Sequence, residues 1–344
     1  MVHLVTGGSG FLGNLIALSL LESGEKVRVL DTWRDYTQPA DIEYIEADVR
    51  DSEAVAKAMK GVDVVHHNAA LVPLTKSGNK FREVNVDGSR IVAKEAVNAG
   101  VSYFIHMSSS ALFGNSQCPI TDKTPYSPVE IYGRAKMDGE MAVIDVCKQS
   151  NLPLLVIRPR TMLGLRRLGI FQILFDWIST NYNIYVIGNG NQPYQFLHAQ
   201  DFMDAYMLAM QKGKTGVFNA GAKDFGTLRE ALENLIVYAG STSKVKSLPA
   251  KLSIACLQLL DKVSLSPLAP WHYLTYHKPF YFDVSPLLEL GWKPKYSNDL
   301  MFRESYDWFI NNPEEAKKMT EGHASPHRST IKQGILNLVK MLSK

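Results

Sequence analysis

A tyrosine and a lysine lie four positions apart in the segment Tyr132-Gly133-Arg134-Ala135-Lys136. If this segment is helical, residues i and i+4 share one face, so the lysine ammonium lies beside the tyrosine phenol. A phenol in water has a pKa of about 10 and is a weak base at neutral pH. A nearby positive charge lowers that pKa, which makes the pair a candidate proton-transfer device. The same spacing also occurs in helices with one buried aromatic side chain and one solvated lysine, so the rest of the chain must decide.

A glycine-rich segment follows the first predicted strand, residues 2–5, and precedes a helical pattern. Within this segment Gly7, Gly10 and Gly13 fit the spacing T-G-x-x-G-x-x-G. Strand, glycine turn and helix in this order are typical of a dinucleotide-binding site. Glycines allow the backbone to approach a pyrophosphate, and the helix N-terminus offers amide donors and the positive end of the helix dipole. We therefore expect a nucleotide site here rather than a glycine turn without a ligand.

Asp31 stands at the end of the second predicted strand, residues 26–30. A carboxylate at this point can accept hydrogen bonds from the adenosine ribose hydroxyls, and it would repel a 2′-phosphate. The sequence thus favours NAD over NADP as the cofactor, although Arg34 lies close enough to weaken this prediction. The alternative for Asp31 is a turn or capping residue.

Strand and helix patterns alternate along the first half of the chain. Further strands are expected at residues 42–47, 62–66, 103–107 and 153–157, and helices at residues 51–59, 81–99 and 132–149. This alternation predicts an α/β fold with a Rossmann-type doubly wound parallel sheet. In such sheets ligands bind beyond the carboxyl ends of the strands, which is where the motifs above fall.

The pattern changes after residue 163. We expect a NAD-binding Rossmann domain over residues 1–163, to which later segments return, and a smaller discontinuous substrate-binding region over residues 164–312. Residues 313–344 are expected to form a tail, in which lysines, arginines and apolar residues recur at helical spacing and no acidic residue follows Gly322. A basic amphipathic helix can make peripheral contact with an anionic membrane or dock on its own domain or a partner subunit; we favour docking.

Composition indicates an ordinary globular protein: 344 residues, 46% hydrophobic, 21% charged, with a net charge of +3. This charge is too small to indicate nucleic acid as a partner, and no segment reaches the length of a membrane span. The cysteines Cys118, Cys147 and Cys256 lie far apart, which predicts neither a metal site nor a disulfide framework. The first strand pattern begins at once and leaves no room for a signal peptide, so a cytoplasmic location is expected.

Taken together, these motifs resemble those of the extended short-chain dehydrogenases/reductases, the NAD-dependent epimerase/dehydratase family. The resemblance covers roughly residues 2–310, and it depends on the order and spacing of several segments. These are Thr6-Gly7-Gly8-Ser9-Gly10-Phe11-Leu12-Gly13, Asp31, Asp48-Val49, His67-Asn68-Ala69-Ala70, Asn85, Ser108-Ser109-Ser110-Ala111-Leu112-Phe113-Gly114, Tyr132-x-x-x-Lys136, Arg158-Pro159 and Leu290-Gly291-Trp292-Lys293-Pro294.

The resemblance implies a catalytic set of three residues. Tyr132 is the acid/base, Lys136 holds the nicotinamide ribose and lowers the tyrosine pKa, and Ser109 orients the substrate hydroxyl. Tyr132 then takes the hydroxyl proton as hydride leaves the substrate carbon for the nicotinamide, and Asp48 meets the adenine. The residues implied to bind NAD are Gly7, Gly10, Phe11, Leu12, Gly13, Asp31, Asp48, Val49, Ala69, Ala70, Asn85, Met107, Tyr132, Lys136 and Pro159.

The substrate implied first is a small molecule, a nucleotide sugar, acted on by an epimerase or dehydrogenase. Ser110 and Ala111 stand where the family's dehydratases carry an Asp-Glu pair, which disfavours 4,6-dehydration. Nucleotide-sugar members usually have asparagine at the position of Thr161 and a phosphate-clamping arginine at that of Tyr194. Cations that could compensate are Arg166, Arg167 and Lys278.

Two alternatives remain open. The first resembles the 3β-hydroxysteroid dehydrogenases and acts on a lipophilic sterol or isoprenoid alcohol, which would enter past Leu257, Leu260, Trp271, Tyr273 and Phe280. The second is a non-catalytic NAD-binding sensor or scaffold, which the intact catalytic set argues against.

A homodimer is also expected from the resemblance, through the helices at residues 81–99 and 130–149. Apolar residues on these helices offer surface for it, unless they face their own sheet. They are Ile91, Val92, Met137, Met141 and Ile144.

Overall fold

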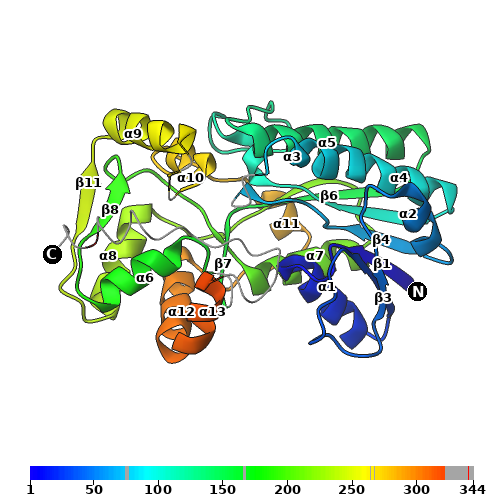
Figure 1. The fold of residues 1–344 in the computed structure, drawn as a ribbon, viewed down its shortest axis with the longest axis horizontal. Helices are drawn as coiled ribbons and strands as arrows, with labels where there is room; N and C mark the ends of the chain where they lie inside the picture. The colour runs from blue at the N-terminus through cyan, green and yellow to red at the C-terminus, as the bar shows by residue number, and fades with distance from the viewer. Residues whose placement is uncertain (74–76, 166–167, 264, 267, 322–339, 341–344) are drawn as a thin grey trace.

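A seven-stranded parallel sheet forms the centre of the computed structural model, which describes residues 1–73, 77–165, 168–263, 265–266, 268–321 and 340. The strand order is β10-β6-β5-β4-β1-β2-β3, and helices cover both faces (Figure 1). The strands are β1 (Val2–Thr6), β2 (Lys26–Asp31), β3 (Glu43–Glu46), β4 (Val64–His67), β5 (Tyr103–Met107), β6 (Leu154–Pro159) and β10 (Gly216–Ala220). The predicted α/β fold with a doubly wound parallel sheet is confirmed.

Alternate residues of each central strand enter two separate cores. Val5 and Val29 lie in one core with Ile16 of helix α1 (Phe11–Glu22). Leu4 and Leu30, their neighbours in the strands, lie in the second core. Because both faces are covered, the strands read as almost continuous apolar runs rather than as alternating patterns.

The second core lies under three helices. These are α2 (Ser52–Ala58), α4 (Ser89–Asn98) and α5 (Ile131–Gln149). Val92 of α4 is fully buried in this core, so its side chain packs against its own sheet, which is the alternative to a subunit contact. Met141 of α5 is 45% exposed, and the homodimer stays a prediction.

The helix expected at residues 81–99 is interrupted. A short helix α3 (Lys80–Arg82) passes into a π-helical segment η2 (Glu83–Gly88) before α4 begins. A Cβ at Gly139 of α5 would lie 2.0 Å from the carbonyl oxygen of Asn85, so α5 packs directly on this segment. Periodicity alone misses such a segment, because a π turn adds one residue without ending the helix.

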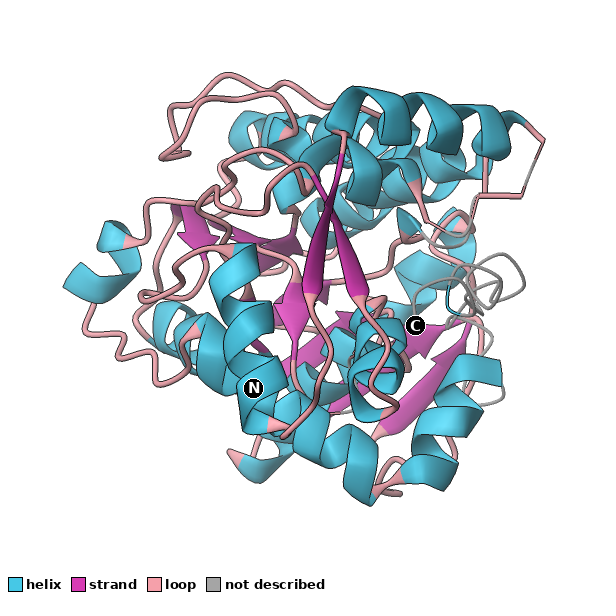
Figure 2. Ribbon diagram, turned by 90° about the vertical axis from the view of Figure 1, so that its left-hand side faces the viewer, coloured by secondary structure: helices cyan, strands magenta, loops and turns pink. Residues whose placement is uncertain are grey.

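The smaller region lies at the end of the molecule away from the N-terminus (Figure 1). Two short parallel sheets belong to it: β8 (Ile184–Ile187) with β11 (Val245–Leu248), and β7 (Met162–Leu163) with β9 (Leu197–His198). Figure 2 shows the first of these in front of the large sheet. The helices are α6 (Phe171–Ser179), α8 (Leu228–Tyr238), α9 (Ala250–Lys262), α10 (Pro270–Thr275), α12 (Asn298–Asn311) and α13 (Pro313–Glu321), while α7 (Ala199–Gln211) and α11 (Ser285–Glu289) lie against the large sheet.

Aromatic side chains fill the core of the smaller region. The Phe171 ring lies edge-on to Phe302 at 4.9 Å and to Phe196 at 5.2 Å between ring centroids. Edge-to-face pairs of this kind are favourable beyond the area they bury. Of the residues expected to border a lipophilic substrate, Trp271, Tyr273 and Phe280 are also at most 5% exposed.

Part of the predicted tail lies within the described residues. Helix α13 belongs to it, and the Nζ of Lys340 lies 2.5 Å from a carboxylate oxygen of Asp176 on α6. Most apolar positions of the expected amphipathic helix, residues 331–339 and 342, lie outside the described residues. Across the described part of the chain, no helix combines the length and the apolar character needed to cross a membrane.

Candidate active site

Tyr132 and Lys136 lie one turn apart at the start of α5. Glu130 caps this helix: its carboxylate accepts hydrogen bonds from the amides of Tyr132, at 2.7 Å, and Gly133, at 2.6 Å. Such a cap satisfies amides that have no partner within the helix and fixes the first turn. The Tyr132 ring lies edge-on to Phe81 at 5.8 Å, and its side chain is 9% exposed. The structure thus places the candidate base on a rigid and almost buried helical turn.

Lys136 brings its ammonium to the carboxyl end of β5. Its Nζ donates to the carbonyl oxygen of Met107 at 2.7 Å, and the side chain is 5% exposed. Burial lowers the pKa of Lys136 to about 8, while the Glu140 carboxylate one turn further along opposes this effect. The ammonium is therefore still protonated at neutral pH but is held in a dry environment.

Behind Lys136, Glu140 and Arg158 form a buried ion pair. The Glu140 carboxylate accepts from both Nε, at 3.0 Å, and Nη2 of Arg158, and also from the Tyr126 hydroxyl at 2.7 Å. Burial, followed by the nearby Glu140, raises the pKa of Tyr126 to about 12, so this tyrosine stays neutral and donates. Arg158 belongs to a motif that the sequence shows, but nothing in the sequence identifies Glu140 as its partner.

Ser109 lies in the loop between β5 and the short 3-10 helix η3 (Ser110–Phe113). Its backbone is extended, and its Oγ accepts a hydrogen bond from the amide of Ala111 at 3.1 Å. A Cβ at Gly133 would lie 2.5 Å from the carbonyl oxygen of Ala111, so this loop packs tightly on the first turn of α5. Ser109 and Tyr132 therefore belong to adjoining segments, and the segments that carry the three predicted catalytic residues lie near the end of β5.

The glycine loop is shaped to admit a phosphate group. Gly7 has a φ of +68°, and a Cβ at Gly13 would lie 2.1 Å from the Gly7 carbonyl oxygen, so larger residues do not fit. Helix α1 begins after Gly10, which has no side chain that could cap the helix. A glycine loop that leads into a helix N-terminus is the arrangement that dinucleotide binding requires, and the loop fits the pyrophosphate of NAD.

Asp31 is tied to the same loop. One of its carboxylate oxygens accepts from the amide of Ser9 at 3.0 Å, and the side chain is 6% exposed. The chain after β2 then folds back, and the Gln38 amide group donates to the carbonyl oxygen of Gly8 at 2.8 Å. A cavity of about 190 Å³ lies beyond β2, lined by Arg34, Asp35, Tyr36, Gln38, Pro39, Ala40, Ile42 and Tyr44. The sequence predicted Asp31 and Arg34 here but gave no signal for Gln38.

His67 links the glycine loop to the π-helical segment. The Ser89 hydroxyl donates to the Asn85 carbonyl, so it must accept from His67 Nε2, which lies 2.8 Å away. His67 Nδ1 is then the acceptor for the Thr6 hydroxyl at 2.8 Å, and Thr6 in turn accepts from the amide of Ala69. Burial, followed by Lys136, lowers the pKa of His67 to about 3, so the ring is neutral and its tautomer is determined by its partners.

Further predicted cofactor residues lie on the π-helical segment, at the ends of β5 and β6, and in the first turn of α1. The Asn85 side chain holds the backbone of Leu71 through two hydrogen bonds, at 2.8 and 3.1 Å, and so supports the segment with Ala69 and Ala70. Met107 and Pro159 are buried at the ends of β5 and β6. Phe11 and Leu12, in the first turn of α1, are partly exposed.

Asp48 and Val49 are engaged by the protein itself. Asp48 forms an ion pair with Arg50 at 2.7 Å, and this hydrogen bond lowers the pKa of the Asp48 carboxyl. Val49 is 4% exposed and packs in the second core. Contacts of Asp48 and Val49 with NAD stay predictions.

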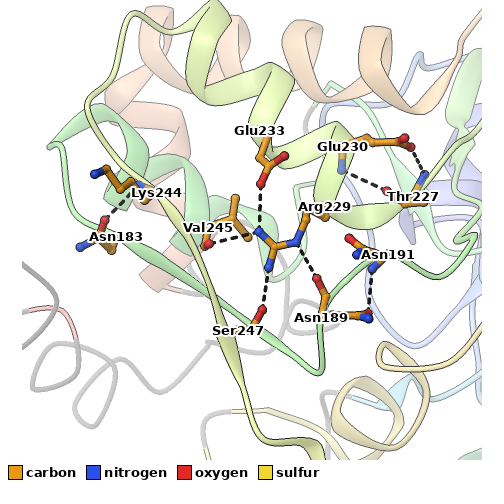
Figure 3. A network of polar contacts seen from close by, with 10 residues as sticks. All are labelled: Asn183, Asn189, Asn191, Thr227, Arg229, Glu230, Glu233, Lys244, Val245 and Ser247. Carbon is orange, nitrogen blue, oxygen red and sulfur yellow. Dashed lines mark hydrogen bonds and ion pairs between the residues drawn. The ribbon is translucent and has the colours of Figure 1, made fainter.

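The loop that leads to Tyr194 is held by Arg229 of α8 (Figure 3). The Arg229 guanidinium donates to the Asn189 carbonyl, the Glu233 carboxylate and the Ser247 hydroxyl, at 2.5, 2.9 and 2.7 Å. Its charge is therefore used within the protein. Of the cations considered as substitutes for an arginine at position 194, Lys278 donates to the Asn115 side chain at 2.7 Å, and residues 166 and 167 lie outside the described residues.

Comparison with known proteins places this geometry in context. The family model "NAD dependent epimerase/dehydratase family" matches residues 3–221. The uncharacterized protein y4nG of Sinorhizobium fredii is 39% identical over 338 residues, which cover 98% of this chain and 85% of that protein. The mouse sterol-4-alpha-carboxylate 3-dehydrogenase, decarboxylating, is 30% identical over 212 residues, 60% of this chain and 58% of that protein.

A solved structure extends the similarity in three dimensions. The UDP-glucuronic acid 4-epimerase of Bacillus cereus, crystallised in complex with NAD, superposes with a TM-score of 0.73 at 20% identity. The match covers 90% of this chain and 99% of the epimerase. At this identity the match establishes a common fold.

Proposed function

Because the chain belongs to the NAD dependent epimerase/dehydratase family, we propose that it is an NAD-dependent oxidoreductase that acts on a secondary alcohol of a nucleotide sugar. The observation that carries the proposal is the position of Lys136, buried one turn from Tyr132 with its ammonium on the Met107 carbonyl. A buried ammonium without a function would be costly. Its place at the carboxyl edge of the sheet is where ligands of this architecture bind.

NAD fits the residues present at this edge. The loop from Gly7 to Gly13 and the first amides of α1 would hold the pyrophosphate, and Asp31 would accept from the adenosine ribose. Ala69 and Ala70 would border the nicotinamide half. The nicotinamide of bound NAD supplies the two-electron acceptor for the hydride that leaves the substrate carbon.

The chain's own residues then handle the proton. The Tyr132 phenol oxygen receives the proton of the substrate hydroxyl, and the Lys136 ammonium stabilises the phenolate from which that transfer begins. The Ser109 hydroxyl orients the substrate oxygen toward Tyr132. Glu130 keeps the first turn of α5 in place through the Tyr132 and Gly133 amides, so the base does not have to be positioned anew in each cycle.

Replacing Tyr132 by phenylalanine tests this mechanism. We expect turnover to fall by about 10²- to 10⁴-fold, the usual contribution of a positioned acid/base, while NAD affinity stays within a few-fold of wild type. The measurement is conversion of UDP-glucose, UDP-galactose and UDP-glucuronate, followed by chromatography and by absorbance at the NADH band. Tyr103→Phe is a matched control because its hydroxyl donates to the Lys214 carbonyl at the opposite end of β5 from Met107. Full activity in Tyr132→Phe would exclude Tyr132 as the base.

Epimerase and dehydrogenase differ in the fate of the cofactor. An epimerase returns the hydride to the same substrate and retains its NAD, whereas a dehydrogenase exchanges the cofactor in every turnover. Mass spectrometry of the small molecules released from freshly purified, denatured protein measures this directly. Stoichiometric NAD or NADH supports an epimerase, and an empty protein supports an exchanging dehydrogenase.

A lipophilic alcohol is the second candidate substrate, and helix α9 is the observation that favours it. Leu252 and Leu259 on its outer surface are 64% and 65% exposed, and none of its residues is buried. Similarity to the mouse sterol dehydrogenase is consistent with this candidate. Thermal melting with a sterol or isoprenoid alcohol, compared with the UDP-sugars above, separates the two: stabilisation by the lipophilic alcohols alone rejects the nucleotide sugar.

A further inference from the structure

Arg160 is a buried cation with unused hydrogen-bond donors. It follows the end of β6 and is 1% exposed. Its Nε donates to the carbonyl oxygen of Gln195 at 3.0 Å, but neither terminal nitrogen, Nη1 or Nη2, has a hydrogen-bond partner among the described residues. The described acidic residues include none that forms an ion pair with it. A guanidinium in this state has two parallel donors available on one side.

Three aromatic rings surround this guanidinium. Its central carbon lies 4.1 Å from the ring centroid of Phe280, 5.0 Å from that of Tyr194 and 5.8 Å from that of Phe282. Ring faces attract a cation, but they do not accept the in-plane N–H groups as an oxyanion does. Burial lowers the pKa of Arg160, an effect that the Tyr194 phenol opposes. The three rings and Arg160 are called the aromatic cage below.

The aromatic cage adjoins the catalytic loop. The Phe282 ring lies edge-on to Phe113 at 6.1 Å, and Phe113 belongs to η3, which Ser109 precedes. Arg160 itself leaves the carboxyl end of β6, the strand next to β5. The aromatic cage therefore lies on the side of the proposed active site that faces the smaller region. On this side the smaller region would contact a substrate.

We propose that Arg160 binds an oxyanion of the substrate, a phosphate or a carboxylate, through Nη1 and Nη2. This inference rests on the proposed function and names the chemistry of its substrate. A buried cation without a counter-charge is unfavourable, and a bidentate oxyanion supplies the missing charge and satisfies both nitrogens. Position 194, where the family resemblance led us to expect an arginine, holds a tyrosine whose ring packs on Arg160. Arg160 therefore supplies a positive charge beside position 194, although it belongs to a different segment of the chain.

Entry of an oxyanion requires one wall of the cage to move. Phe280 and Phe282 are attached to the rest of the protein by isolated β-bridges, Tyr194 with Phe280 and Ile120 with Phe282. The amide of Phe280 donates to the Pro193 carbonyl at 2.9 Å. Binding should therefore shift the aromatic side chains of this wall, which intrinsic fluorescence of the adjacent Trp271 can report, since its ring lies 5.4 Å from Phe280.

Arg160→Met tests the inference, because methionine keeps the length and apolar stem but removes the charge. The probes are UDP-glucose, UDP-glucuronate, UDP and inorganic pyrophosphate, titrated by calorimetry into protein saturated with NAD. We expect at least one oxyanion probe to bind wild type and to lose about 10- to 100-fold in affinity in the variant. The matched control is Arg303→Met, whose guanidinium also lies over a ring, that of Tyr238 at 5.1 Å, but is only partly buried and is paired with Asp299.

The probes identify the oxyanion. A loss for all four assigns Arg160 to a phosphate, and a loss for UDP-glucuronate alone assigns it to a sugar carboxylate. Arg160→Lys keeps the charge but not the bidentate donor, so its affinity for the probe should lie between those of wild type and Arg160→Met. The lysine variant also provides the test if the methionine variant does not fold. Unchanged affinity in both variants, or no binding of any oxyanion to wild type, overturns the inference. Binding of pyrophosphate through Arg160 without binding of any nucleotide sugar would reject only the proposed substrate.

Discussion

Two arginines leave the end of β6 two positions apart, and each is 1% exposed. Arg158 reaches α5, where the fully buried Glu140 carboxylate and the Tyr126 hydroxyl accept from its Nε and Nη2, while Nη1 has no hydrogen-bond partner among the described residues. Arg160 reaches the smaller region, where three rings surround it and no carboxylate of the described residues pairs with it. Burial is equal in the two cases, so the difference lies entirely in their partners.

The two environments suggest two roles. Arg158 and Glu140 form a complete ion pair, in which the two charges balance, and this pair supports α5 and through α5 the position of Lys136. Arg160 has no counter-charge among the described residues, so its charge and its Nη1 and Nη2 donors can serve a ligand. A buried charge is thus informative about function only after its partners have been identified.

The largest expected effect comes from breaking the complete pair. Glu140→Gln leaves the Arg158 charge buried without a counter-charge, and we expect the free energy of unfolding to fall by about 3 to 5 kcal/mol. Urea denaturation followed by circular dichroism measures it. The double variant Glu140→Met with Arg158→Met removes both charges and should be close to neutral. If the single variant is as stable as wild type, the proposed difference between the two arginines disappears.

A smaller effect is expected from acid, which acts on the neutral histidines beside the complete pair. Burial, followed by Lys136, lowers the pKa of His67 to about 3 and that of His106 well below its usual value. Below the unfolded pKa of about 6.5, a histidine in the unfolded chain binds a proton that the same histidine in the folded protein does not bind. The stability is therefore fully present above pH 6.5 and is lost as the pH falls. His67 should contribute about 1.4 kcal/mol per pH unit, or about 2 kcal/mol between pH 6.5 and 5, and His106 should act in the same direction.

Denaturation at a series of pH values, with and without His106→Leu, checks this expectation. Neither ring nitrogen of His106 has a hydrogen-bond partner among the described residues, so leucine should be tolerated at neutral pH. The variant should then lose stability less steeply in acid than wild type. An unchanged slope would mean that His106 does not titrate on unfolding.

The smallest effect on the free energy of unfolding is expected at Arg160. Arg160→Met removes an uncompensated buried charge but also its contacts with the rings, each worth up to about 2 kcal/mol when desolvated. These contributions have opposite signs, so we expect the free energy of unfolding without ligand to change by less than about 1 kcal/mol. Urea denaturation of the free protein measures it. A loss as large as that of Glu140→Gln would show that Arg160 is structural like Arg158, and would favour a ligand-free role for the cage.

The sequence predicted those features that depend on short separations. Tyr132 and Lys136 were identified because four positions along a helix define one face, and the glycine loop because three glycines follow a strand directly. The parallel sheet followed from alternating segments, each of which is local. These features can be predicted without knowing which residues far apart in the sequence are in contact.

The partners of buried charges could not be predicted in the same way. Arg160 contacts Tyr194 and Phe280, which lie 34 and 120 positions further along the chain, so their meeting depends on the completed fold. The Glu140–Arg158 pair joins a helix to the strand after it, and only the side-chain directions show that they face each other. The π-helical segment around Asn85 was missed because a single added residue hardly disturbs a helical pattern.

The seventh strand of the sheet, β10, limits how the protein can be divided into fragments. β10 comes from the second half of the chain and pairs along β6, opposite Leu155, Val156 and Ile157, which are at most 1% exposed. A fragment that stopped at residue 163 would present β6 as an uncovered hydrophobic edge, and such edges recruit other strands and aggregate. The dinucleotide-binding half therefore depends on the chain that follows it for solubility as well as for a substrate. Exchange of the smaller region between relatives would have to preserve β10 to give a soluble protein.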